Sequence, residues 1–479
     1  MVTSERNTIE TELRRLIGAR PPGTQLPSVR ELTRRHRASP VTVQRIVTRL
    51  KHEGLVDARP GHGTFVASRP VPDDEPDLHW QTVALGARPL PGEGMFGLLA
   101  SPPPGVISLA TGYPDSSLWP VGLLASAASR AARRAGAWGR SAVEGLDELR
   151  AWFAADAGAG VRPDDVMIVG GGQAALSAAF RSLATPGDPI LVESPTYVGA
   201  IEAARFADLV PVPVPVDRDG IRVDLLDGAL RATGATLMYV QPRLANPTGA
   251  SIPVDRRAAL LDLAATHGAF VIEDDFARDF AAPDDAPPLF RDDVDGHVIH
   301  VRSLTKATAP ALRIAAVVAR GPAMARLRNA RLVDDFFVSG VLQETALAVV
   351  TAPGWRRHLV NMRRVIAERR AVAIAALDSV PNCSLAVRPA GGFVLWLRLA
   401  DHLDDIDVSA RARDAGVLVN HGRPWFCAEP DGAYLRVSVA GVHSADVAEG
   451  VRRLATVLGA NAKHRSSKQR VRPLPSKTR

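Results

Sequence analysis

Six short apolar runs, separated by stretches with a helical pattern, constrain the fold of this chain more than any other feature. They span Val166–Val169, Ile190–Val192, Thr236–Val240, Phe270–Ile272, Val298–Val301 and Ile314–Val318. Continuous apolar strands are buried on both faces of a sheet, and their alternation with helices is typical of a parallel sheet covered by helices. The sequence therefore predicts an α/β domain with a mostly parallel sheet, beginning near residue 106.

A smaller subdomain is predicted at the end of this domain. A long helical zone over residues 326–380 is followed by two further strand-like segments, Gly391–Leu399 and Tyr434–Val439. We expect these segments to form a small C-terminal α+β subdomain, so that the whole domain spans residues 106–460.

The sequence favours a soluble protein of the cytoplasm. No apolar run reaches the ~18 residues that a membrane span needs. The N-terminal stretch MVTSERNTIETELRRL carries charges where a signal peptide would have apolar residues. The two cysteines, Cys383 and Cys427, lack metal-like neighbours in the sequence, so we expect neither a disulfide framework nor a metal site.

The first 68 residues have a different pattern, which predicts three helices and a hairpin. The turn Pro21–Gly23 ends the first helix. Ser28 is a candidate N-cap of the second helix with Glu31 as its capping-box partner, and Ser39-Pro40 begins the third. The apolar positions expected to pack inside are Ile9, Leu13, Leu16, Ile17, Val43, Ile46, Val47 and Leu50. Two short strands, Leu55-Val56 and Thr64–Val66, then enclose a turn at residues 59–63.

Charge divides the chain into a basic head, an acidic body and a basic tail. Residues 1–72 carry 13 Lys or Arg against six Asp or Glu, and residues 460–479 carry seven basic residues and no acidic one. Basic ends predict a polyanionic partner, although for the tail at 461–479 a disordered, solvated segment is the simpler interpretation. Residues 69–105 hold eight prolines and predict a linker that packs in part against a domain.

The third helix is the expected DNA-reading element. Such a helix lies in the major groove with its N-terminal side chains toward the base edges, and arginines supply the phosphate contacts. Arginines at positions 30, 34, 35, 37, 45 and 49 gather around this helix, and Arg59 and His62 lie at the hairpin turn. A single arginine is more often a solvated surface charge, but the whole arrangement indicates double-stranded DNA as a partner.

The segment QLPSVRELTRRHRASPVTVQRIVTRLKHEGLVDARPGHGTFVA strongly resembles the winged helix-turn-helix of the GntR family. The resemblance implies DNA contacts from Arg30, Ser39, Thr42, Gln44 and the wing at Gly61–Gly63. Arg45, Arg59 and His62 are the adjoining basic candidates. One departure is Pro40, where the family usually has an arginine. The absence of that arginine removes a phosphate or base contact, so the operator sequence does not follow from the resemblance.

Polar groups follow five of the predicted strands in an order that suits pyridoxal phosphate. That cofactor needs a lysine for its imine, an acid for its pyridine nitrogen, and donors for its phosphate. The five sites are Gly170–Gln173, Glu193–Tyr197, Asn246–Gly249, Glu273–Asp275 and Ser303–Lys306, the last with Arg313 seven residues on. Each alone is more often structural, but strand ends are where ligands gather in parallel sheets, and five sites in order indicate a binding site.

These motifs resemble the fold-type I aminotransferases, and their fusion to a GntR-type head resembles the MocR/PdxR regulators over nearly the whole chain. The resemblance implies that Lys306 forms the imine, Asp274 pairs with the pyridinium nitrogen and Tyr197 stacks on the ring. Asn246 would bond the phenolic oxygen, and Arg436 would bind a substrate α-carboxylate. The phosphate would be held by Gly171, Gly172, Gln173, Ser303 and Arg313, and Gly112 would lie in the loop near the substrate.

Two departures from the aminotransferase pattern bear on activity. Phe276 stands where the family usually has a tyrosine whose hydroxyl bonds the phenolic oxygen, so Asn246 is left as the donor. Trp138 stands where the family often has a tyrosine that reaches the neighbouring subunit's phosphate; an indole N–H can still donate. Both departures are compatible with cofactor binding and argue against strong transamination.

The sequence thus predicts a homodimeric regulator that senses pyridoxal phosphate, or its adduct with an amino acid or amine, and shifts its DNA-binding heads. A second hypothesis is a true aminotransferase with an accessory DNA-binding domain, which multi-turnover amine transfer would reveal. A third is a DNA-binding scaffold that has lost the cofactor, which would stay colourless with pyridoxal phosphate. The operator, the target genes, the direction of regulation and the identity of the amine do not follow from the sequence.

Overall fold

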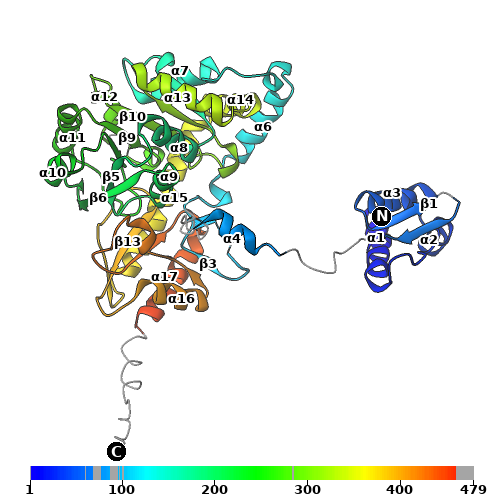
Figure 1. The fold of residues 1–479 in the computed structure, drawn as a ribbon. Helices are drawn as coiled ribbons and strands as arrows, with labels where there is room; N and C mark the ends of the chain where they lie inside the picture. The colour runs from blue at the N-terminus through cyan, green and yellow to red at the C-terminus, as the bar shows by residue number, and fades with distance from the viewer. Residues whose placement is uncertain are drawn as a thin grey trace, which may run out of the picture. The chain divides into compact units, whose positions relative to one another are not determined.

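The computed structural model describes residues 2–59, 61–67, 77–86, 95, 98–99, 102–282 and 285–459. The chain forms two compact units, Met1–Pro89 and Leu90–Arg479 (Figure 1). The predicted tail at 461–479 and most of the predicted linker at 69–105 lie outside the described residues. Within the linker, residues His79–Leu85 form a helix, α4, which the proline-rich composition did not predict.

The first unit is the predicted arrangement of three helices and a hairpin. Its elements are α1 (Val2–Ala19), α2 (Val29–His36), α3 (Pro40–His52), β1 (Val56–Arg59) and β2 (Gly63–Val66). The two strands pair antiparallel. The core consists of apolar side chains from all five elements and their connections, and includes Ile9, Leu13, Leu32, Val43, Ile46, Val47, Leu50 and Val66.

The helix starts follow the predicted caps, with one correction. The Ser28 hydroxyl accepts a hydrogen bond from the Glu31 backbone N–H at 3.2 Å, and the Ser39 hydroxyl accepts one from Thr42 at 3.1 Å. Each bond satisfies a helix N–H that has no partner within the helix. The expected capping box is not formed, because the Glu31 carboxylate pairs with Arg35 one turn along the helix.

The second unit is built on an eight-stranded sheet with strand order β4-β11-β10-β9-β8-β5-β6-β7. Its strands are β4 (Val166–Val169), β5 (Pro189–Ser194), β6 (Val210–Asp217), β7 (Gly220–Ile221), β8 (Leu237–Val240), β9 (Phe270–Asp274), β10 (Val298–Ser303) and β11 (Ala315–Val318). Strands β10, β9, β8, β5 and β6 run parallel, whereas β11 runs antiparallel to both β10 and β4. The predicted mostly parallel α/β sheet is confirmed.

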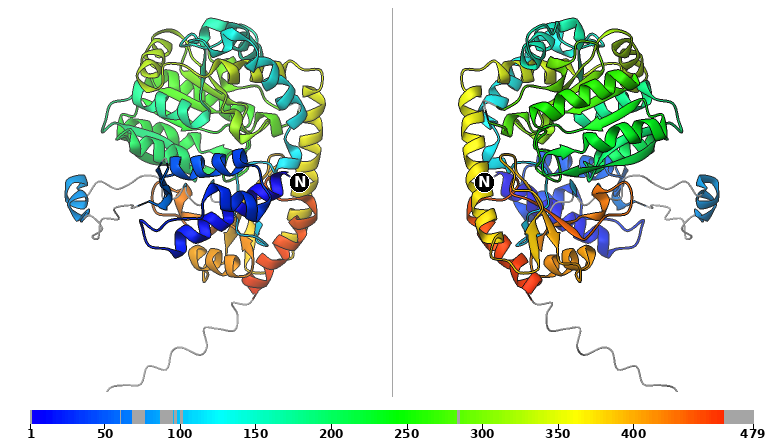
Figure 2. Two further views of the ribbon diagram at one scale, coloured as in Figure 1. Left: turned by 90° about the vertical axis from the view of Figure 1, so that its right-hand side faces the viewer. Right: turned by 90° about the vertical axis from the view of Figure 1, so that its left-hand side faces the viewer.

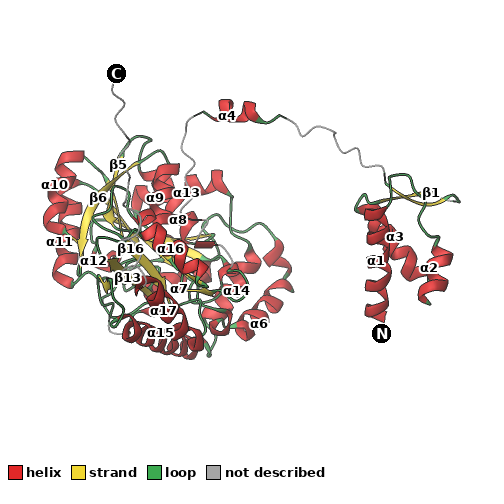
Figure 3. Ribbon diagram, turned by 90° about the horizontal axis from the view of Figure 1, so that it is seen from below, coloured by secondary structure: helices red, strands yellow, loops and turns green. Residues whose placement is uncertain are grey.

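Helices cover both faces of this sheet, as Figure 3 shows. They are α6 (Val121–Ala132), α7 (Asp147–Ala157), α8 (Gly172–Leu183), α9 (Val198–Phe206), α10 (Val223–Thr233), α11 (Val254–His267), α12 (Leu289–Asp292), α13 (Gly321–Asp334), α14 (Gly340–Val350) and α15 (Trp355–Leu377). Strand residues alternate between two cores: Val166 and Ile168 belong to the core that includes residues of α7, α10, α11 and α14, while Met167 and Val169 belong to the core that includes residues of α8, α9 and α13. Both faces are therefore buried, which explains the continuous apolar runs.

The predicted C-terminal subdomain is also present. A four-stranded antiparallel sheet has the order β12-β13-β16-β15, and a short parallel pair joins β14 to β3. The elements are β3 (Ile107–Ser108), β12 (Cys383–Leu385), β13 (Val394–Leu399), α16 (Asp405–Asp414), β14 (Val417–Leu418), β15 (Asn420–His421), β16 (Tyr434–Ser438) and α17 (Ser444–Gly459). Helix α15, yellow in Figure 2, runs from the large sheet toward this part and packs on α17.

Candidate functional site

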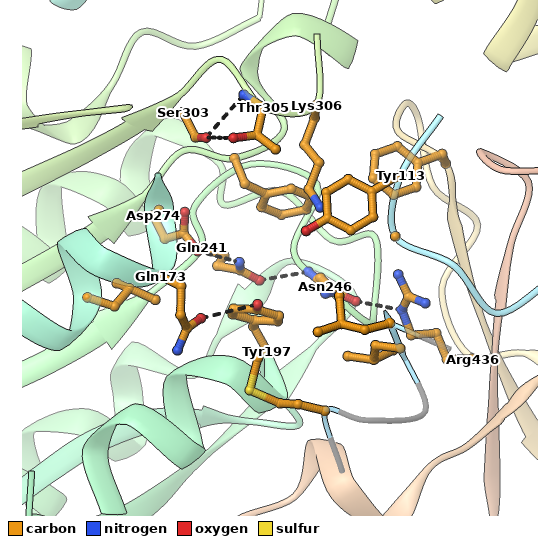
Figure 4. A pocket seen from close by; sticks show the side chains of 18 of the residues that line it. Tyr113, Gln173, Tyr197, Gln241, Asn246, Asp274, Ser303, Thr305, Lys306 and Arg436 are labelled. Carbon is orange, nitrogen blue, oxygen red and sulfur yellow. Dashed lines mark hydrogen bonds between the residues drawn. The ribbon is translucent and has the colours of Figure 1, made fainter. Parts of the chain in front are cut away.

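The carboxyl ends of the parallel strands surround a cavity of about 370 Å³. Loops after β4, β5, β8, β9 and β10 supply its lining, and β16 adds a side chain from the small sheet (Figure 4). Of the residues expected at the cofactor site, the cavity is lined by Gly112, Gly172, Gln173, Tyr197, Asn246, Asp274, Ser303, Lys306, Arg313 and Arg436. Gly171 does not line it. Residues far apart in the sequence therefore meet where open parallel sheets bind their ligands.

Lys306 is a half-buried lysine whose amine the site keeps close to neutral. It follows β10, and its Nζ lies 3.6 Å from the centre of the Tyr113 ring. Burial, together with the positive charges of Arg436 and Arg313, lowers the pKa of Lys306 to about 7, and Asp274 opposes that shift. A neutral amine is the nucleophilic form, so this lysine is prepared to attack a carbonyl carbon.

Asp274, at the end of β9, is held by two donors that sequence reasoning missed. Its Oδ2 accepts hydrogen bonds from the Tyr239 hydroxyl at 2.7 Å and from Gln241 Nε2 at 2.9 Å. Burial raises the pKa of Asp274, while the two donors and the nearby Lys306 favour its charged form. Gln241 Oε1 also accepts from the Asn246 backbone N–H at 2.8 Å, so one amide fixes both site residues.

A cradle that could hold an anion lies where β4 leads into α8, and its glycine turn leaves no room for a side chain of its own. Gly171 has a φ of +105°, and Arg313 Nη2 donates to the Gly170 carbonyl at 3.0 Å. A Cβ at Gly171 would lie 2.3 Å from Arg313 Nη2. Nearby, the Ser303 hydroxyl donates to Thr305 Oγ1 and accepts the Thr305 N–H. Helix N–H groups, a guanidinium and hydroxyls together suit an anion such as phosphate.

Substitution of Gly171 tests whether this cradle binds the cofactor, and the same substitution at the neighbouring Gly170 is the control. We expect Gly171→Ala to weaken binding of pyridoxal phosphate by roughly tenfold or more, because Arg313 must move and a charge-assisted hydrogen bond is lost. Gly170→Ala should bind as the wild type does, since Gly170 has open space at its Cβ position and no positive φ. Titration of each purified variant, followed by visible absorption, measures the two affinities. Equal affinities for the two variants would remove the cradle from the cofactor site.

Tyr197 and Gln173 form a second hydrogen-bonded pair on the cavity wall. The Tyr197 hydroxyl donates to Gln173 Oε1 at 3.3 Å, and Gln173 Nε2 donates to the Gly199 carbonyl at 2.8 Å. Burial raises the pKa of Tyr197, so the ring keeps its proton. The side chain is thereby fixed as a neutral aromatic surface inside the cavity (Figure 4).

Arg436 is a buried cation without an acidic partner among the described residues. Its Nε donates to Asn246 Oδ1 at 2.8 Å and its Nη1 donates to the Ala110 carbonyl at 2.9 Å. Burial lowers the pKa of Arg436 to about 10. A buried charge with only neutral partners is costly, so the remaining Nη2 is suited to an incoming anion. Because Asn246 Oδ1 accepts from Arg436, the Asn246 amide nitrogen remains available as a donor.

The two departures from the aminotransferase pattern have different surroundings. Phe276 lines the cavity, with its ring centre 6.3 Å from that of Phe393 in an edge-on contact, so the expected tyrosine hydroxyl is indeed missing at this wall. Trp138 is 71% exposed, and its Nε1 donates to the Ala132 carbonyl of the same chain at 2.9 Å. The indole N–H that the sequence left free to reach a neighbouring subunit is therefore already bonded.

Three apolar residues on one wall of the cavity were not foreseen. Met95, Leu98 and Leu99 come from the segment assigned to the linker, and all three line the cavity that contains Lys306. Met95 and Leu98 also pack against a cluster formed by Val198, Trp396, Trp425 and Tyr434. A cavity wall supplied by residues so distant in the sequence from the strands carries no local sequence signal.

In the first unit, the predicted DNA-contacting residues come from α2, from α3 and its N-cap, and from the hairpin. Arg30, Ser39, Gln44, Arg45, Arg59, Gly61 and His62 are exposed, and Thr42 is half-buried beneath its bond to Ser39. In the described part of the chain, Arg30 and Arg45 have no carboxylate partner. Arg35 and Arg49, which the sequence placed in the same basic cluster, are instead paired with Glu12 and Glu31 and with Glu10, respectively.

Val41, at the second position of α3, is a further candidate that sequence reasoning missed. It is 67% exposed at the end of the helix expected to approach the base edges. An exposed methyl-bearing side chain there is suited to the C5-methyl group of thymine. The helical pattern placed Val43 in the core and left Val41 outside it, but it assigned Val41 no role.

Comparison with known proteins separates the two units. Residues 105–454 match the family model of aminotransferase class I and II, and residues 5–66 match that of bacterial regulatory proteins of the gntR family. No helix in the described ranges is long and apolar enough to cross a bilayer.

Individual relatives follow the same division. The chain is 33% identical over 362 residues to the 2-aminoadipate transaminase of Thermus thermophilus, covering 74% of this chain and 90% of the relative. It is 29% identical over 447 residues to the probable rhizopine catabolism regulatory protein MocR of Rhizobium meliloti, covering 90% and 88%. A crystal structure of LysN, the alpha-aminoadipate aminotransferase of Thermus thermophilus complexed with N-(5'-phosphopyridoxyl)-L-leucine, matches with a TM-score of 0.71 and 32% identity, covering 77% of this chain and 97% of that one.

Proposed function

Because this chain belongs to the class I and II aminotransferase family and carries a GntR-type winged helix at its N-terminus, we propose that it is a transcriptional regulator that reads its ligand at Lys306. Residues 1–68 bind DNA, residues 69–105 link the units, residues 106–460 bind cofactor and effector, and the basic tail at 461–479 adds charge. The observation that carries the proposal is the presence of both a winged helix and a buried lysine site in one chain.

Pyridoxal 5′-phosphate is the cofactor of this domain, and the residues present fit it. The cavity contains a near-neutral lysine, a buried acid and a cation that has no acidic partner in the described part of the chain, and the turn at Gly171 beside it leaves no room for a side chain. When bound, the cofactor supplies an aldehyde for covalent capture of amines and a ring that withdraws electrons from them.

The chain's own residues have distinct tasks toward that cofactor. Lys306 binds it covalently, and Asp274, oriented by Tyr239 and Gln241, holds a proton on the pyridine nitrogen. The Asn246 amide would donate to the phenolic oxygen, and the neutral Tyr197 ring, held by its bond to Gln173, would pack on the cofactor ring. The phosphate is held by Gly171, Gly172, Gln173, Ser303 and Arg313.

Arg436 favours an amino acid as the effector of this site. Its free Nη2 lies beside the cavity next to Gly112, whose added Cβ would be 3.8 Å from Nη2 and 3.7 Å from Lys306 Nζ. An effector carboxylate bound by Arg436 therefore brings its amino group to the reactive centre. An effector that binds one arrangement of the heads more tightly shifts the regulator toward that arrangement.

The regulator acts as a homodimer in the cytoplasm, on two half-sites of double-stranded DNA. Trp138 and Phe336 are large, exposed apolar residues on segments that flank α14. We expect these side chains to be covered by the second subunit, where apolar surface leaves water. Two heads per dimer then contact two half-sites, at a spacing that the linker permits.

Phe276 lacks the hydroxyl that the tyrosine of the family donates at this position. We therefore propose that regulation, rather than amine transfer, is the main activity. We expect the wild-type chain to lack multi-turnover transfer between an amino acid and a keto acid, and Phe276→Tyr to raise the rate roughly 10- to 100-fold, the range that one well-placed donor contributes. Keto-acid formation at substrate excess measures both rates, and Phe393→Tyr, across the same ring contact, is the control. Turnover at enzymatic rates in the wild type would favour the alternative of an aminotransferase with an accessory DNA-binding domain, which the 33% identity to a transaminase also supports.

A further inference from the structure

The wall formed by Met95, Leu98 and Leu99 has no task in the cofactor site described above. We propose that this wall selects the effector: the pocket takes a 2-amino acid with an uncharged, apolar side chain, which packs against these three residues. The inference rests on the proposed function, since it assumes a carboxylate on Arg436 and an amine near Lys306.

Every charged side chain among the described lining residues of the cavity already has a proposed role toward the cofactor or the α-carboxylate. Among its described lining residues, the charged side chains are Asp274, Lys306, Arg313 and Arg436. The proposed roles assign the first three to the cofactor and Arg436 to the α-carboxylate. No cation is left for a side-chain carboxylate, and no acid is left for a side-chain ammonium group. The stretch 94–114, which contains the wall, has no Asp, Glu, Lys or Arg at any position.

The surfaces that remain are apolar. Met95 and Leu98 are anchored on the cluster of Val198, Trp396, Trp425 and Tyr434, so the wall has a firm backing. On the same cavity, Phe276 and Phe393 add aromatic surface. A charged group placed against such surfaces would lose its hydration without gaining a partner, whereas an apolar side chain gains from leaving water.

Leu99 is the most informative residue of the wall. It lines the cavity, yet 62% of its surface is exposed. A leucine that lines a ligand cavity without being buried by the protein itself is placed to be covered by a ligand. Methionine at position 95 adapts its shape readily, which suits a wall that accepts leucine, methionine or phenylalanine side chains.

The test uses the full chain loaded with pyridoxal phosphate and follows the visible absorption of the bound cofactor. L-Leucine, L-methionine and L-phenylalanine should change the spectrum at concentrations at least tenfold lower than L-glutamate or L-lysine. Leu99→Arg should reverse the order of affinities. It should weaken binding of L-leucine and strengthen binding of L-glutamate by roughly tenfold each, because the arginine supplies the missing cation. Leu85→Arg, an equally drastic change at a 73% exposed leucine that does not line the cavity, should keep the wild-type order.

The outcomes separate the inference from the function on which it rests. If the wild type prefers L-glutamate or L-lysine, or if Leu99→Arg leaves the order unchanged, the wall does not select the effector, while cofactor binding stands. If pyridoxal phosphate gives no absorption with the wild-type chain, the proposed function fails and the inference fails with it. A merely structural wall would alter the amount of folded protein in Leu99→Arg without altering the ratio of the two amino-acid affinities.

Discussion

Replacing Lys306 with alanine is expected to abolish the visible absorption that the wild-type chain gives with pyridoxal 5′-phosphate. The shift of that absorption away from that of the free cofactor requires a covalent bond to an amine, and Lys306 is the lysine that lines the cavity. Borohydride reduction of the loaded wild type should fix the cofactor on the peptide that contains residue 306, and mass spectrometry locates it. The variant should stay unlabelled after the same treatment.

The pH dependence of capture gives the same prediction a second measurement. The pKa of Lys306 lies near 7, so the amine is mostly protonated below that pH and mostly neutral above it. The rate of cofactor capture should therefore fall about tenfold for each pH unit below 7 and level off above it. Lys306→Arg keeps the positive charge without a primary amine and serves as the control for folding. An absorbing adduct in Lys306→Ala, fixed at another lysine, would contradict the assignment.

Arg45→Ala is expected to weaken operator binding by about tenfold or more, the cost of one lost base or phosphate contact. Arg45 is exposed on α3 and has no carboxylate partner among the described residues, so its guanidinium is free to contact DNA. Arg14→Ala is the matched control. It removes the same charge from the same unit, but Arg14 is already paired with Glu10 and Glu53.

The measurement is a DNA titration of both variants at several salt concentrations. A lost phosphate contact should also reduce the slope of log affinity against log salt by about one, whereas a lost base contact should change sequence preference instead. Equal losses in Arg45→Ala and Arg14→Ala would mean that only net charge matters, and α3 would not be the reading helix.

The main sheet was predictable because its strands are buried on both faces. Four of the six apolar runs became the parallel strands β5, β8, β9 and β10, and the other two became β4 and β11, which pair antiparallel with each other. Strand β6 was not predicted, because its sequence VPVPVPVD contains three prolines at alternate positions. Residues alternate along a strand, so the intervening valines keep the N–H groups that bond to β5, and the prolines are tolerated near the edge of the sheet.

The cofactor site was predictable only for residues that follow strands. Lys306 and Asp274 lie directly after or at the end of a strand, where the topology alone brings them together. Tyr239 and Gln241 were missed because their bonds to Asp274 depend on the pairing of β8 with β9. That pairing is set by the whole sheet, and no local pattern in the sequence indicates it.

Met95 follows the winged helix and the linker in the same chain, so the proposed effector site and the DNA-binding unit are covalently joined. Binding of an amino acid at one can therefore be coupled to binding of the operator at the other. Free energies of coupling are reciprocal: whatever factor the amino acid contributes to operator affinity, the operator must return to amino-acid affinity. An effector concentration that half-saturates the free protein therefore differs from the one that half-saturates it on DNA. On the proposed function, the wall at Met95 would select the amino acid, and the operator would alter the amino-acid concentration at which the regulator responds.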